Sequence, residues 1–284
     1  MHLPVAAADP LGHVKDAPLF SWGEGDLGWQ IWLGEKLEGV SRALMSVGFG
    51  KHVFILMLAG ALTLLLFWIR AKQVKNETVP GRFGNLLESI MLFLRDQVVR
   101  PFMGEHGDRY LPFVWGFFFL ILINNILGLI PIFDYLGHGG NTATANIGVT
   151  AALALCSFSL YHYLGIKEQG GVWVYTKNIF PHVPVFILPI IVPVEIIAHL
   201  VRPAALAIRL CANMVAGHTL MAVILGFTLQ AAALGLAGWG SVTLVSCVAV
   251  IALTFLELLV AMIQAFVFTF LSTVFLSLAV HPEH

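Results

Sequence analysis

VTLVSCVAVIALTFLELLVAMIQAFVFTFLSTVFLSLAV forms residues 242–280, and Glu257 is its single charged side chain. As one helix, this stretch would extend roughly 60 Å, about twice the hydrocarbon thickness of a bilayer. Residues 183–225 form a second long apolar stretch, interrupted by a few polar side chains. Both are therefore predicted to be long helices that cross the membrane at a strong tilt.

The composition of the whole chain points the same way. The 284 residues are 58% hydrophobic and 11% charged, whereas a soluble domain carries about 25% charged residues. The mean hydropathy is +0.88. These values predict an all-α polytopic membrane protein. The net charge near −1 predicts no nucleic-acid partner, and the widely spaced Cys156, Cys211 and Cys247 exclude a disulfide scaffold.

Five membrane spans and one surface helix are expected along the chain. The surface helix is residues 83–104, where charged residues alternate with apolar ones at helical spacing. Residues 1–50 are expected to be an extramembrane N-terminal segment, and residues 51–284 are expected to form a single membrane domain. A loop is expected at 166–182 and a turn at 234–241. The predicted spans are about 52–69, 110–133, 147–164, 183–225 and 242–280.

Cations near the span ends predict the orientation. Arg70, Lys72, Lys75 and Arg82 follow the first span, and Lys167 follows the third. Because cytoplasmic flanks are enriched in Lys and Arg, these flanks are expected in the cytoplasm. With five spans, the N-terminus is then external and the C-terminus cytoplasmic.

A polar stripe runs along the helix predicted for 183–225. On a helical wheel, its five members lie within about 80° of one another. Charges inside a bilayer cost about 2.5–3.5 kcal/mol or more, so a stripe of them calls for an explanation. The first three members either neutralise each other or take part in function, and the sequence leaves both open. The stripe is Glu195, His199, Arg202, Arg209 and Asn213.

Arg209 differs from the rest of the stripe. Its neighbours three and four residues away on the helix include no acid. A guanidinium keeps its charge in a protein, so its partner is expected to be a carboxylate on another helix or another chain.

His218 lies about 180° around the helix from Arg209. Glu257 is its expected intramembrane partner, and Gln264 lies seven residues further along the same face. The pair is either a satisfied contact between helices or a proton relay, since both groups can titrate.

Several runs resemble one family. AIRLCANMVAGHTL (207–220) and LELLVAMIQAFVFTFLSTVFLSLA (256–279) resemble the arginine helix and last helix of subunit a of the F-type ATP synthase membrane sector. VPGRF (79–83), INNILGLIP (123–131) and TATANIGVT (142–150) resemble its earlier segments. The resemblance covers about residues 50–280.

The resemblance implies a proton-translocating stator subunit with two aqueous half-channels. It places the essential arginine, facing the carboxylate of a ring of small c subunits, on Arg209, with Asn213 and Gln264 beside it and Glu195 in the same helix. His218 and Glu257 stand exchanged relative to some bacterial members. The implied partners are the c-ring, peripheral-stalk subunit b, indirectly the F1 ATPase sector, and the lipid bilayer of a bacterial inner membrane. The family implies no catalytic site on this chain and no cofactor.

Two other classes compete with this interpretation. A secondary transporter with an intramembrane arginine–carboxylate site would be expected to show internal repeats, and none is visible. A metal-dependent membrane enzyme would use histidines at close spacing. His162, His182, His199 and His218 show no such spacing, so no metal site is predicted.

Overall fold

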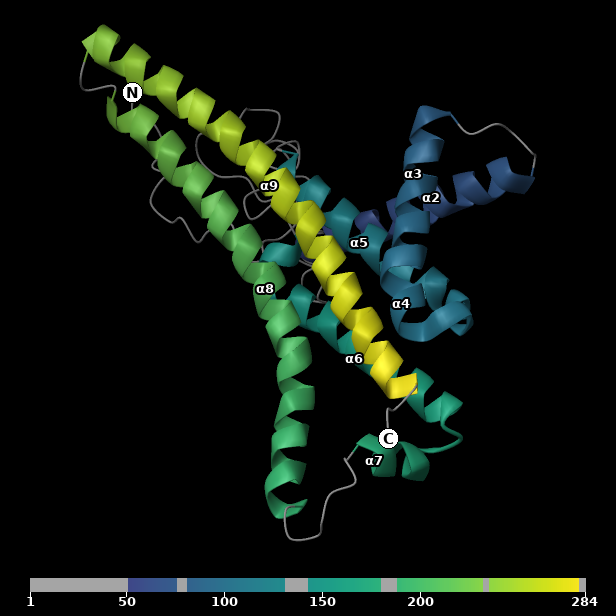
Figure 1. Ribbon diagram of the computed structural model, residues 1–284. Helices are drawn as coiled ribbons and strands as arrows, with labels where there is room; N and C mark the ends of the chain where they lie inside the picture. Colours follow the sequence, from purple (N-terminus) through teal and green to yellow (C-terminus); the bar gives the residue numbers. More distant parts are fainter. Residues whose placement is uncertain (1–50, 76–80, 131–142, 180–187, 232–234, 281–284) are drawn as a thin grey trace, which may run out of the picture. The chain divides into compact units, whose positions relative to one another are not determined.

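The computed structural model describes residues 51–75, 81–130, 143–179, 188–231 and 235–280 (Figure 1). All secondary structure in these ranges is helical. The predictions for residues 1–50 lie outside the described residues.

Helices long and apolar enough to cross a membrane number five within the described ranges. The all-α polytopic architecture is thus confirmed. The runs are His52–Lys75, Arg82–Leu129, Ile147–Glu168, Ile191–Gln230 and Gly238–Val280.

The second run is divided into several elements. α3 (Arg82–Leu94) passes through a π turn (Arg95–Val99) into the short α4 (Arg100–Met103). A 3₁₀ segment (Gly104–Tyr110) leads into α5 (Leu111–Leu129). Gly104 has φ +61°, a left-handed conformation that favours glycine, so it separates the helix predicted at 83–104 from the apolar span.

The remaining helices overlap the predicted spans, but one or both ends of each differ from the prediction by four to seven residues. α2 is Lys51–Lys75 and α6 is Ile147–Glu168, preceded by a 3₁₀ turn at Ala143–Ala145. α8 runs from Leu188 to Gln230 and α9 from Gly235 to Val280. The 43 and 46 residues of these two helices make each far longer than a bilayer is thick. The expected great length of both is confirmed.

Two sequence predictions about connecting segments are wrong. The turn expected at 234–241 is helical from Gly235 onward, because glycine in a helix costs only about 1 kcal/mol and apolar neighbours such as Trp239 continue the pattern of α9. Gly235 itself has φ +80° and begins the helix. The loop expected at 166–182 contains the two-turn α7, Val172–Ile179. The bulky residues of α7, among them the buried Tyr175, make this segment a short amphipathic helix.

The described residues form two compact units. The first contains the described parts of 1–60, 122–150 and 209–263, and the second those of 61–121, 151–208 and 264–284. In the second unit, the C-terminal part of α9 packs through phenylalanines. Phe266 contacts Phe93, Phe268 stacks on Phe117, and Phe270 contacts Phe102.

Hydrogen bonds also join helices of the second unit. The hydroxyls of Ser157 on α6 and Ser272 on α9 are bonded at 2.9 Å, and both residues are buried. Ser277 donates to the carbonyl of Phe102 at 2.8 Å. Because hydrocarbon offers no competing partners, such bonds help to fix the register of the helices.

Candidate functional site

In the first unit, α8 and α9 lie side by side (Figure 1). His218 on α8 approaches Glu257 on α9. The Nε2 atom of His218 lies 4.0 Å from Oε1 of Glu257. The carboxylate side chain is 5% exposed and the imidazole 17%. The predicted approach of these two residues is confirmed.

Gly217 makes room for this pair. A Cβ atom built at position 217 would overlap the Glu257 carboxylate. Met214 on α8 and Ala261 on α9 pack against each other as a small buried apolar cluster in the same unit. Glycine and alanine allow close approach of helices in membranes, so α9 can pass near α8 at the level of Glu257.

The carboxylate has few other contacts. Within the described part of the chain, both oxygens of Glu257 are buried and accept no hydrogen bond. A buried carboxylate without donors is stable only when it is protonated or faces a cation. The His218–Glu257 pair can therefore hold and release a proton among apolar surroundings.

Arg209 lies on the opposite side of α8, as the helical wheel predicts. Its side chain is exposed, and the neighbouring Ile208 is 60% exposed. No acidic side chain in the described ranges forms an ion pair with Arg209. Ala205, Ala212 and Ala216 are exposed on the same face. This face of α8 thus combines one cation with small residues that permit close approach of another helix.

Two buried asparagines, Asn124 and Asn125, lie on α5 in the same unit. The hydroxyl of Thr144 donates to Oδ1 of Asn125 at 2.9 Å. Asn124 is also fully buried, and neither of its side-chain polar atoms is hydrogen-bonded within the described residues. These residues are not among the site residues predicted from the sequence. Two adjacent asparagines in an apolar span were the available signal.

A second titratable group of residues lies in the second unit. The ring of His199 on α8 stacks on His162 of α6 with centroids 5.8 Å apart. Nδ1 of His162 is hydrogen-bonded to the hydroxyl of Tyr175 on α7. The guanidinium of Arg202 lies 5.2 Å from the centroid of Phe275.

Tyr175 had no signal in the sequence, because it lies in a segment predicted to be a loop. Burial raises the pKa of Tyr175 to about 12. The phenol therefore stays protonated at neutral pH and keeps its hydroxyl available for the bond to His162.

The other predicted residues are distributed along α8 and α9. Asn213 is half buried on α8, one turn beyond Arg209. Gln264 is 3% exposed on α9 and, like Glu257, buried. Glu195 belongs to α8, and its side chain lies outside the described part of the structure. Within that part, no group of three or more His, Cys, Asp or Glu side chains could hold a metal ion.

Comparison with known families gives this arrangement a context. The family model for the ATP synthase A chain matches residues 53–277. The chain belongs to this family. The match includes the five spanning runs almost completely, together with Arg209, His218, Glu257 and Gln264.

Bacterial members of the family are similar along most of the chain. ATP synthase subunit a of Myxococcus xanthus is 36% identical over 253 residues, covering 88% of this chain and 79% of the relative. The Maricaulis maris subunit a is 36% identical over 84% of this chain and 92% of its own. For Gluconobacter oxydans, identity is 39% over 82% of this chain and 88% of the relative.

Proposed function

We propose that this ATP synthase A chain family member is the proton-translocating stator subunit of an F-type ATP synthase, and that Arg209 faces the carboxylate of a c-ring. The observation that carries the proposal is the exposed guanidinium of Arg209. It lies among exposed apolar and small side chains on a membrane helix, with no acidic partner in the described ranges. Such a charge calls for an acidic partner, which this proposal places on another chain.

Arg209 would perform two tasks. A carboxyl carried through lipid is neutral, because burial disfavours its charged form. Opposite a guanidinium the anion is favoured, so the proton is released there. The fixed positive charge would also stop a proton from passing directly between two aqueous half-channels. Each proton crossing 100 mV makes about 2.3 kcal/mol available to turn the ring.

The proton path would use both titratable groups of residues. We assign entry from the outside to His218 and Glu257, with Gln264 and the buried amide of Asn125 along the way. Exit toward the cytoplasm would use Glu195 and His199, continued by His162 and Tyr175. The His162–His199 stack and the His162–Tyr175 hydrogen bond support this continuation.

The expected placement follows from the same proposal. Residues 51–284 would form one domain in a bacterial inner membrane, with an external N-terminal segment (1–50) and a cytoplasmic C-terminus. The last two helices would lie at a strong tilt, with Asn213 and Arg209 toward the ring. Peripheral-stalk subunit b would be the second membrane partner, and the F1 sector an indirect one.

Purification of the tagged full-length chain tests the proposal. A stator should co-purify with a ring of small proteolipids and a soluble ATPase. Ala212→Trp adds bulk next to Arg209 and should release the ring, whereas Ala152→Trp, an exposed position on α6, serves as the matched control. Recovery of the wild-type chain alone or as a homo-oligomer would instead identify a transporter and contradict the proposal.

A further inference from the structure

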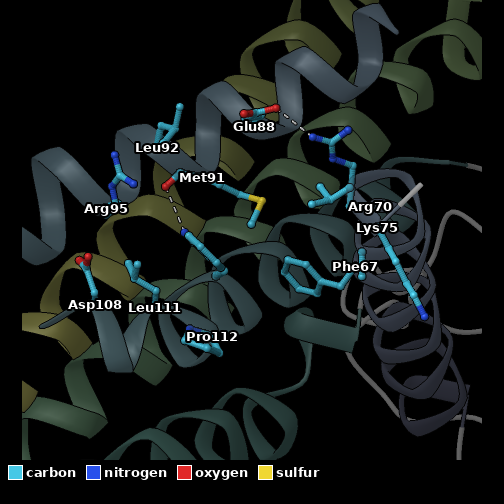
Figure 2. A pocket seen from close by; sticks show the side chains of 13 residues that line it. Phe67, Arg70, Lys75, Glu88, Met91, Leu92, Arg95, Asp108, Leu111 and Pro112 are labelled. Carbon is cyan, nitrogen blue, oxygen red and sulfur yellow. Dashed lines mark hydrogen bonds and ion pairs between the residues drawn. The ribbon is translucent and has the colours of Figure 1, made fainter. Parts of the chain in front are cut away.

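A cavity of about 740 Å³ opens between α2, α3 and the beginning of α5, within the second unit (Figure 2). Its volume is in the range of small-molecule binding sites, about 300–1,000 Å³. On α2, the lining positions 67, 70, 71, 74 and 75 recur at helical spacing. One face of that helix therefore turns toward the cavity along its last two turns.

The walls of the cavity are mainly large apolar side chains. Phe67 and Val74 come from α2, Leu92 from α3, and Leu111 and Trp115 from α5. The indole nitrogen of Trp115 donates to the carbonyl of Met91 at 3.1 Å, so its polar edge is satisfied within the protein. What remains is a surface suited to hydrocarbon.

Charged side chains complete the lining. Arg70 is bound to Glu88 at 3.0 Å, as Figure 2 shows. Asp108 is paired with Arg100 at 3.0 Å, so both acids of the lining are neutralised. Lys75 forms no ion pair with any acidic side chain of the described ranges. Arg95 is paired with Asp96 at 2.9 Å, so Lys75, at the edge of the cavity, is the lining cation without an ion pair in the described ranges (Figure 2).

We propose that this cavity binds one phospholipid with an anionic headgroup. Lys75 binds the headgroup phosphate, and an acyl chain lies along Phe67 and Trp115. Lys72 and Lys75 occupy the last turn of α2, at the end of a span, where headgroups are found. Basic pockets between membrane helices attract anionic lipids, and each cation near the surface strengthens binding about fivefold.

A helix of another subunit fits this cavity less well than a lipid does. Helices in membranes pack through small residues that let backbones approach. Among the lining residues only Ala71 is small, and most of the others have long or aromatic side chains. The lining residues are also distinct from those of the proposed proton path.

Native mass spectrometry of the purified complex tests this site. The complex is delipidated and then titrated with phosphatidylglycerol or with phosphatidylcholine, which has a phosphate but no net charge. We expect about fivefold tighter binding of phosphatidylglycerol to one site, and loss of this preference in Lys75→Gln. The matched control is Lys72→Gln, one turn away and outside the cavity, where the preference should persist.

A second variant tests the apolar wall. Leu92→Trp fills the cavity without changing its charge and should abolish retention of both lipids. The inference is overturned if the wild-type complex shows no headgroup preference, or if Lys72→Gln loses it as fully as Lys75→Gln. It also fails if Leu92→Trp still retains phosphatidylglycerol, or if inorganic phosphate displaces the lipid. Loss of a protein subunit from Leu92→Trp with the lipid count unchanged would assign the cavity to a partner helix.

Discussion

Gly217 lies where α8 passes the carboxylate of Glu257, and a methyl group there would overlap the carboxylate oxygens. Gly217→Ala must therefore displace Glu257 from His218. We expect ATP-driven proton pumping to fall about tenfold, since overpacking of this kind costs about 1–3 kcal/mol. Gly226→Ala on the same helix is the control, because nothing lies within 4 Å of its added Cβ. Equal pumping by the two variants would show that the pair tolerates displacement.

His218 and Glu257 can be tested as a pair at their distance of 4.0 Å. If they exchange a proton, the double variant His218→Glu with Glu257→His should retain more pumping than either single substitution. A double-mutant cycle should give a coupling energy of about 1–3 kcal/mol. If the losses of pumping in the two single variants simply add in the double variant, the two residues act independently.

The contact between α6 and α9 includes a hydrogen bond between Ser157 and Ser272. In a background without the three native cysteines, Ser157→Cys with Ser272→Cys should form a disulfide in membranes under mild oxidation. Ser159→Cys with Ser272→Cys is the control, because Ser159 is exposed. Electrophoresis with and without reductant reads out the bond, and cross-linking of the control pair alone would contradict this packing.

At the level of elements, the sequence predicted the long helices well and their connections poorly. Runs such as 52–69 are marked by composition alone, because a membrane helix must be apolar for about 20 residues. The start of α9 at Gly235 was missed because glycines in 234–241 signal a turn in isolation. The chain from Gly235 onward is helical in the structure, which the turn propensity of these glycines does not predict.

In the candidate site, too, some residues could be predicted from the sequence and others could not. Helical geometry alone placed His218 and Arg209 on opposite sides of α8, and the structure agrees. Charge and apolar surroundings also made Glu257 the expected partner of His218. Tyr175 could not be found in this way, because its bond to His162 depends on how α7 folds against α6. The spacing of residues within one segment does not predict which residue of a distant segment it will contact.

The orientation of the whole molecule is open to direct test. Lys75→Cys and Lys167→Cys should resist a membrane-impermeant maleimide added outside intact cells, in a background without native cysteines. Both should react after permeabilisation, because both positions are exposed. Their location inside follows from the enrichment of Lys and Arg in cytoplasmic flanks of membrane spans. Labelling of either position from the outside would invert or rearrange the proposed topology.

Substitution of Arg209 tests the central claim most directly, with proton flux measured in vesicles stripped of the soluble ATPase and coupled pumping in intact ones. Arg209→Ala should abolish pumping and let protons leak, because the barrier between half-channels is gone. Arg209→Lys should also fail to pump but leak less, since it keeps a charge without the planar guanidinium. Arg202→Ala, which loses contact with Phe275, should be much milder. Normal pumping by Arg209→Ala, or greater damage from Arg202→Ala, would contradict the proposed role of Arg209.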